Sequence, residues 1–277
     1  MSGENASQAS HRDARVLLET AVAAADAAAV FIRTRAGDAS SLAWIEKSPA
    51  DFVSEVDHGA EERIREIVLA RHPGARVIGE ELSPDMLADT GLAFIVDPLD
   101  GTTNFLHGYP EYAVSIGVAR EGELVSAVVV NVPVGERFTA LRGGGAWRDG
   151  VPARVSRITD PGRALIGTGF PFKHPETLPA WQRQFGKVML ATAGVRRAGA
   201  AALDLCDVAC GRFEAFWELR LAPWDFAAGL LIVREAGGIV TDLAGQPPPL
   251  IHGPIVAGSP AMHRWLLETI TAANDVT

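Results

Sequence analysis

Two carboxylates, Asp97 and Asp100, lie three residues apart between an apolar run and Gly-Thr-Thr-Asn. Residues 92–96 have the composition of a buried strand, and the proline between the acids fixes the chain as it leaves that strand. Gly101 can turn the backbone because it has no Cβ, and the polar residues after it indicate a helix start, where N–H groups bind anions. The acids alone could be a turn aspartate and a helix cap. The whole pattern instead predicts carboxylates that hold Mg²⁺ against a phosphate.

Two other stretches supply further carboxylates. Residues 77–79 form a short apolar run that ends in Glu80 and Glu81, and Asp225 falls in the first turn of an apolar helical pattern. Because acids on loops are usually solvated, we expect that role for Glu81 and a site role for Glu80. Four acids in one site would repel one another strongly without cations, so the cluster predicts metal dependence.

The elements that must position these acids change in type near the middle of the chain. Residues 13–35 and 58–71 have the spacing of amphipathic helices. Residues 111–147 alternate between apolar runs and glycine turns, which indicates a mostly antiparallel sheet. The first half, residues 11–152, is therefore predicted to be α+β, after a disordered tail over residues 1–10.

The second half, residues 153–277, alternates between strand and helix patterns, which is typical of a mixed α/β arrangement. The expected strands and helices are 164–169, 178–190, 195–197, 200–210, 213–218, 223–236, 239–243, 255–257 and 260–273. The chain is thus of the α/β class. Since Asp225 belongs to this half and the other acids to the first, the site is expected between the two halves.

The acidic stretches resemble the three metal-binding signatures of the inositol monophosphatase family. The members of that family are Mg²⁺-dependent, lithium-sensitive phosphatases. The signatures are Glu80-Glu81, residues 97–104 and Trp224-Asp225, and the resemblance extends to residues 47–57 and 200–218. It implies a layered sandwich of helices and sheets, as in the inositol monophosphatase and fructose bisphosphatase fold. It also implies a homodimer, because the family commonly forms one.

The resemblance implies a role for each acid. One Mg²⁺ would be bound by Glu80, Asp97 and the Leu99 carbonyl, a second by Asp97, Asp100 and Asp225, and a weaker third near Glu80. The phosphate would rest on the N–H groups of Gly101 and Thr102. A water oriented between Glu80 and Thr102 would attack phosphorus in line, so the catalytic residues would be Glu80, Asp97 and Thr102.

Further residues take supporting roles by the same resemblance. Asp51 and Asp57 would support the metal site from just outside it, and Lys47 would help to balance phosphate charge, although an exposed structural lysine is an equally good interpretation. Glu218 and the backbone near Ala201 would contact the hydroxyl groups of the substrate.

Composition limits the class of protein. The 277 residues include 48% hydrophobic and 21% charged residues, which is typical of a soluble globular protein. The 34 acidic and 25 basic residues give a formal net charge of −9, which makes nucleic-acid binding unlikely. Cys206 and Cys210 are expected to be reduced core residues in a cytoplasmic protein. We expect neither a signal peptide nor a membrane-spanning run.

The sequence therefore predicts an Mg²⁺-dependent phosphomonoesterase that acts on a small polyol phosphate, with inositol monophosphate as the default. Relatives with the same fold dephosphorylate histidinol phosphate, fructose 1,6-bisphosphate or adenosine 3′,5′-bisphosphate, and the catalytic acids do not separate these substrates. The agreement over residues 196–218 favours the inositol phosphatase branch. A regulatory binding protein on the same scaffold ranks lower, because such a role would not require all four acids.

Overall fold

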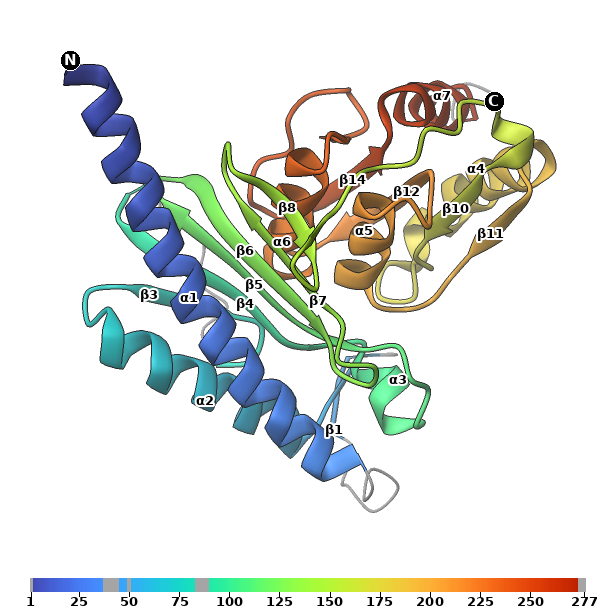
Figure 1. Cartoon of the computed structure of the whole chain (residues 1–277). Helices are drawn as coiled ribbons and strands as arrows, with labels where there is room; N and C mark the ends of the chain where they lie inside the picture. Colours follow the sequence, from blue (N-terminus) through green and yellow to red (C-terminus); the bar gives the residue numbers. More distant parts are fainter. Residues whose placement is uncertain (1, 37–44, 49–50, 83–89, 274–277) are drawn as a thin grey trace.

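Two large β-sheets alternate with three layers of helices in the computed structural model, which describes residues 2–36, 45–48, 51–82 and 90–273 (Figure 1). The side chains of residues 2–10, 45–48 and 51–53 are outside this description. The order of layers is helices, first sheet, helices, second sheet, helices. The α/β class and the layered sandwich predicted from the sequence are confirmed.

The first sheet has the strand order β3-β4-β5-β6-β7-β8-β9, and α1 and α2 pack on its outer face. Among its described strands only β3 and β4 run parallel, with Gly79 opposite Val96. Glu80, which directly follows β3, and Asp97 of β4 therefore lie side by side. The bounds are α1 (Ser2–Ala36), α2 (Glu55–Arg71), β3 (Arg76–Gly79), β4 (Leu92–Asp100), β5 (Ala113–Arg120), β6 (Glu123–Asn131), β7 (Arg137–Leu141), β8 (Gly145–Arg148) and β9 (Val151–Pro152).

The second sheet has the order β11-β10-β12-β14-β13 and contains parallel and antiparallel pairs, as predicted for the second half. Helices α5 and α6 lie between the two sheets, and α4 and α7 cover the far face of the second (Figure 1). The bounds are β10 (Leu165–Thr168), α4 (Leu178–Ala191), β11 (Gly194–Arg196), α5 (Ala201–Ala209), β12 (Ala215–Leu221), α6 (Pro223–Glu235), β13 (Ile239–Thr241), β14 (Gly253–Gly258) and α7 (Pro260–Thr271).

Shorter elements complete the described chain. They are the strand pair β1 (Ile45–Ser48) and β2 (Asp51–Val53), the helix α3 (Thr102–Leu106), and two 3₁₀ turns, Pro161–Arg163 and Pro175–Thr177.

Within the described residues, three apolar cores fill the spaces between the five layers. The outer cores lie between α1, α2 and the first sheet, and between α4, α7 and the second sheet. The middle core includes Leu205 and Phe226 of α5 and α6. These two helices are apolar on nearly every side because a sheet covers each face of their layer. Their fixed position places the start of α6, and therefore Asp225, against the first sheet.

The structure differs from the sequence prediction at the N-terminus. Helix α1 begins at Ser2, whereas we expected disorder over residues 1–10. A helix already formed from residue 13 onward can extend backward cheaply, because each added residue gains a hydrogen bond without a new nucleus. From the sequence alone, residues 42–46 are also expected to form a short strand. Part of that range lies outside the described residues, and β1 begins at Ile45. The domain boundary at residue 152 stays a prediction.

Most of the remaining elements agree with the prediction to within a few residues at their ends, but β2, β9 and the two 3₁₀ turns were not expected. Within the described residues, none of the helices is long and apolar enough to span a bilayer.

Candidate active site

Three carboxylates meet at the inner end of the first sheet. Glu80, Asp97 and Asp225 each offer an oxygen atom, and these oxygens all lie within 4.8 Å of one another. Glu80 directly follows β3, Asp97 lies in β4, and Asp225 occupies the first turn of α6. Asp225 is held in place because its Oδ2 accepts a 2.7 Å hydrogen bond from the Ala222 N–H. The structure thus brings together acids from both halves of the sequence.

The end of β4 shapes this site through its irregular backbone. The register between β4 and β5 shifts between Asp97 and Asp100, and the Leu99 N–H donates a 3.0 Å hydrogen bond to Asp97 Oδ1. Gly101 then has a φ of 91°, and a Cβ there would lie 2.9 Å from the Glu111 carbonyl oxygen. Only glycine satisfies both conditions, so the predicted turn is present.

Asp100 is buried but does not belong to the group of three. Its Oδ2 accepts a 2.8 Å hydrogen bond from the Ala202 N–H at the start of α5, and the Ala201 N–H also favours its charged form. Burial and the neighbouring Asp225 nevertheless raise its pKa well above the usual range. Asp100 therefore joins β4 to the middle helix layer beside the cluster.

The cluster is electrostatically strained without a cation. Burial raises the pKa of Asp97 well above its ordinary value, and the charges of Glu80, Asp100 and Asp225 raise it further. A cation between these carboxylates would remove the repulsion, and carboxylate oxygens are ligands that Mg²⁺ prefers. The residues present therefore fit a divalent metal.

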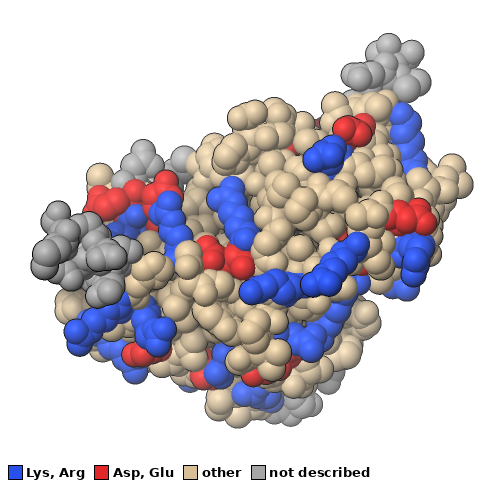
Figure 2. Space-filling model, turned by 45° about the horizontal axis from the view of Figure 1, so that its top comes forward, with Lys and Arg blue, Asp and Glu red and all other residues tan. Residues whose placement is uncertain are grey.

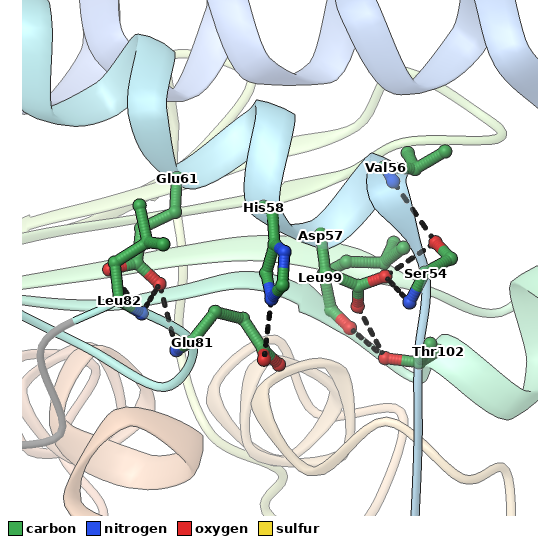
Figure 3. A network of polar contacts seen from close by, with 9 residues as sticks. All are labelled: Ser54, Val56, Asp57, His58, Glu61, Glu81, Leu82, Leu99 and Thr102. Carbon is green, nitrogen blue, oxygen red and sulfur yellow. Dashed lines mark hydrogen bonds and ion pairs between the residues drawn. The ribbon is translucent and has the colours of Figure 1, made fainter. Parts of the chain in front are cut away.

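Beside the acids, Thr102 is tied to the start of α2. Its Oγ1 lies 2.8 Å from Asp57 Oδ1 and 3.1 Å from the Leu99 carbonyl oxygen. The other oxygen of Asp57 accepts hydrogen bonds from the N–H and hydroxyl of Ser54, the N-cap of α2 (Figure 3). Asp57 therefore holds Thr102 from the helix layer behind the cluster, and its supporting role at a metal site stays a prediction.

A cavity of about 570 Å³ opens beside the cluster and is lined by residues of both halves. Glu218 lies on its wall, and burial together with Asp225 raises the Glu218 pKa to about 8 although Arg197 opposes the shift. Gly169 makes room for this side chain, because a Cβ there would lie 2.1 Å from the carboxylate. Ala201 also lines the cavity. The cavity can thus present a protonated acid to a polar ligand.

Some predictions fall outside what the structure describes, and one is wrong. Lys47 and Asp51 lie in β1 and β2, but their side chains are outside the described part. Glu81 was expected to be solvated, whereas its side chain is only 3% exposed and its Oε2 lies 3.6 Å from His58 Nε2. It is buried because α2 packs over the end of β3.

Two further buried acids were not predicted from the sequence. Asp204 of α5 lines the cavity. Burial raises its pKa well above the usual value, and the negative charge of Glu218 raises it further. The sequence feature that could have indicated it is the presence of two acids, Asp204 and Asp207, in an otherwise apolar helical run. Glu61 of α2 accepts hydrogen bonds from the N–H groups of Glu81 and Leu82. No local pattern distinguishes it from its neighbour Glu62.

Comparison with known proteins identifies relatives over most of the chain. The model of the inositol monophosphatase family matches residues 13–275. An inositol-1-monophosphatase from Rhizobium meliloti (strain 1021) is 45% identical over 234 residues, which are 84% of this chain and 88% of that protein. A putative Nus factor SuhB from Neisseria meningitidis serogroup B is 41% identical over 255 residues, 92% of this chain and 98% of that protein.

The solved structures include a similar fold. The crystal structure of the extragenic suppressor protein suhB from Bartonella henselae has a TM-score of 0.86 and 38% identity to this chain. It matches over 92% of this chain and 98% of its own.

Proposed function

The chain belongs to the inositol monophosphatase family, and from this premise we propose that it is a Mg²⁺-dependent phosphomonoesterase. Its substrate is a small polyol phosphate, with inositol monophosphate as the first candidate. The observation that carries the proposal is the meeting of Glu80, Asp97 and Asp225 within 4.8 Å beside a cavity. Such a cluster supports this chemistry because it is repulsive without cations and suits phosphate once they bind.

Two or three Mg²⁺ ions would be held by Glu80, Asp97, Asp100 and Asp225 with the Leu99 carbonyl. Bound there, Mg²⁺ would supply positive charge for the phosphate and the leaving alcohol and would acidify a nearby water.

The side chains of the protein would orient the reactants. Thr102, whose hydroxyl is held by Asp57, and Glu80 would each accept a hydrogen bond from the same water. A lone pair of that water would then point at the phosphorus atom. The N–H groups of Gly101 and Thr102 would donate hydrogen bonds to a phosphate oxygen. Glu218 and the backbone at Ala201 would bind hydroxyl groups of the alcohol, for which the partly protonated Glu218 can donate as well as accept.

The test is phosphate release from inositol 1-phosphate, histidinol phosphate, fructose 1,6-bisphosphate and adenosine 3′,5′-bisphosphate, with Mg²⁺, with EDTA and with added lithium. We expect release that needs Mg²⁺ and is inhibited by lithium. Asp97→Asn should reduce turnover at least about a hundred-fold, because it removes charge from the centre of the cluster. The exposed acid Glu62 provides a matched control, Glu62→Gln. Near-normal turnover by folded Asp97→Asn would refute the site.

A second candidate is a regulatory binding protein, favoured by the relative from Neisseria meningitidis that is named a putative Nus factor. On the face shown in Figure 2, basic and acidic side chains are interspersed with large areas of neither. That distribution and the net charge of −9 favour a protein partner over nucleic acid. No release of phosphate from the whole panel by a folded, Mg²⁺-loaded protein would favour this candidate.

A further inference from the structure

A buried carboxylate on α2 holds the segment that follows Glu80. Glu61 is 0% exposed. Its Oε2 accepts a 2.9 Å hydrogen bond from the Glu81 N–H, and its Oε1 accepts a 3.2 Å hydrogen bond from the Leu82 N–H (Figure 3). A buried carboxylate is unfavourable unless hydrogen bonds compensate it. The two oxygens of Glu61 thus accept hydrogen bonds from Glu81 and Leu82, the two residues that directly follow Glu80 of the cluster.

The strand end opposite Glu61 leaves space for it. A Cβ on Gly79, the last residue of β3, would lie 2.1 Å from Glu61 Oε1 and 2.2 Å from Glu61 Cδ. Any larger residue would push the carboxylate away from the two N–H groups. The glycine before Glu80 is therefore required by the position of Glu61.

The second acid of the pair faces α2. The side chain of Glu81 is 3% exposed, and its Oε2 lies 3.6 Å from His58 Nε2. The residue before it, Glu80, instead offers an oxygen within 4.8 Å of oxygens of Asp97 and Asp225, so the two adjacent acids of this turn contact different groups. Asp57, on the same turn of α2 as His58, holds Thr102 (Figure 3).

We propose that Glu61 is a positioning residue that fixes the backbone after β3 and so holds the Glu80 carboxylate in the metal-binding cluster. The inference rests on the proposed function, since it assigns Glu61 to the metal site of that function. The same inference explains Gly79, because only a residue without a side chain leaves room for the Glu61 carboxylate.

The main test compares Glu61→Gln with Glu62→Gln. Both changes remove one acid from adjacent positions of α2, but Glu62 is exposed. In Glu61→Gln the NH₂ group of the amide would face one of the two backbone N–H groups, so that hydrogen bond is lost. The other backbone N–H would donate to a neutral amide oxygen instead of a charged carboxylate. We expect the Mg²⁺ concentration for half-maximal phosphate release to rise about ten-fold, with kcat at saturating Mg²⁺ within about two-fold of the wild type. Glu62→Gln should match the wild type in both.

A second variant tests the same contact from the other side. Gly79→Ala should also weaken Mg²⁺ activation, because its methyl group displaces the Glu61 carboxylate. Since both changes disrupt one contact, the double variant Glu61→Gln/Gly79→Ala should show less than the sum of the two single effects. Fully additive effects would contradict the proposed contact.

Direct Mn²⁺ binding, measured by the loss of the free-ion signal in electron paramagnetic resonance, separates this inference from the proposed function. Weaker Mn²⁺ binding by Glu61→Gln than by the wild type and Glu62→Gln supports the inference, even if no substrate in the panel is hydrolysed. Equal Mn²⁺ affinity, with only a lower melting temperature in EDTA, would show that Glu61 merely stabilises the fold. Absence of Mn²⁺ binding by the folded wild type would overturn both.

Discussion

Glu218 is a single residue whose environment has a measurable consequence for stability. Burial first, and then Asp225, raises its pKa from 4.5 to about 8. Between these two values the native protein binds a proton that the unfolded chain releases. The stability of the metal-free protein should therefore fall as the pH rises from about 4.5, with the loss complete above about pH 8.

Glu218→Gln should remove this contribution, because the amide does not ionise. At pH 9 in EDTA the variant should be more stable than the wild type by on the order of 2 kcal/mol, a value reduced because the cavity leaves the side chain partly hydrated. At pH 4.5 the two proteins should differ little. Urea unfolding at pH 4.5, 7 and 9 measures the difference. Parallel pH profiles of the two proteins would show that Glu218 has an ordinary pKa.

At the scale of elements, the start of α2 determines how Asp57 reaches the site. Ser54 caps the helix: the Val56 N–H donates to Ser54 Oγ, and Asp57 Oδ2 accepts from the Ser54 N–H at 2.8 Å. The Ser54 hydroxyl lies 2.6 Å from the same oxygen. The hydrogen bonds that begin the helix therefore also orient the acid that holds Thr102.

Ser54→Ala should lower the free energy of unfolding by about 1 kcal/mol, because it removes the side-chain cap. We also expect lower turnover, since Asp57 loses one of the groups that orient it. Guanidinium unfolding and phosphate release measure the two effects. The control is Glu55→Gln, which removes an exposed ion pair with Arg35 and one negative charge from the first turn of α2, and should cost less stability than Ser54→Ala. Stability of Ser54→Ala equal to that of the control would contradict the capping role.

The sequence could predict those parts of the site that depend on local patterns. Asp97 and Glu80 each follow an apolar run, and Asp225 begins one, so each acid could be assigned to an element end. The turn at Gly101 was predictable for the same reason. The strand and helix periods likewise determined most elements, because burial of one face repeats along the chain.

The remaining features depend on contacts between distant segments. Glu61 and Glu62 are adjacent and chemically alike, and only the packing of α2 on the end of β3 buries one and exposes the other. The same packing buries Glu81. Asp204 faces the cavity because two sheets enclose α5. No periodicity within one element contains this information.

At the scale of the whole molecule, the cluster joins parts of the chain that are far apart in sequence. Glu80 and Asp97 belong to the first sheet, whereas Asp225 begins a helix of the middle layer. A cation bound by all three would bind the folded protein and not the unfolded chain. Its effect on stability should therefore follow mass action, with about 2.7 kcal/mol at a free concentration one hundred times Kd.

Asp225→Asn tests this connection. The amide keeps an oxygen that can accept from the Ala222 N–H, so the helix start should survive, while one negative charge leaves the cluster. In EDTA the variant should melt at or above the temperature of the wild type, because repulsion with Asp97 and Asp100 is removed. In saturating Mg²⁺ the order should reverse, because only the wild type has the full set of ligands. If Asp225 were only a helix-start residue, the variant would show the same change in both conditions. Thermal unfolding in EDTA and across a Mg²⁺ titration therefore distinguishes a metal that joins the two parts from a purely structural acid.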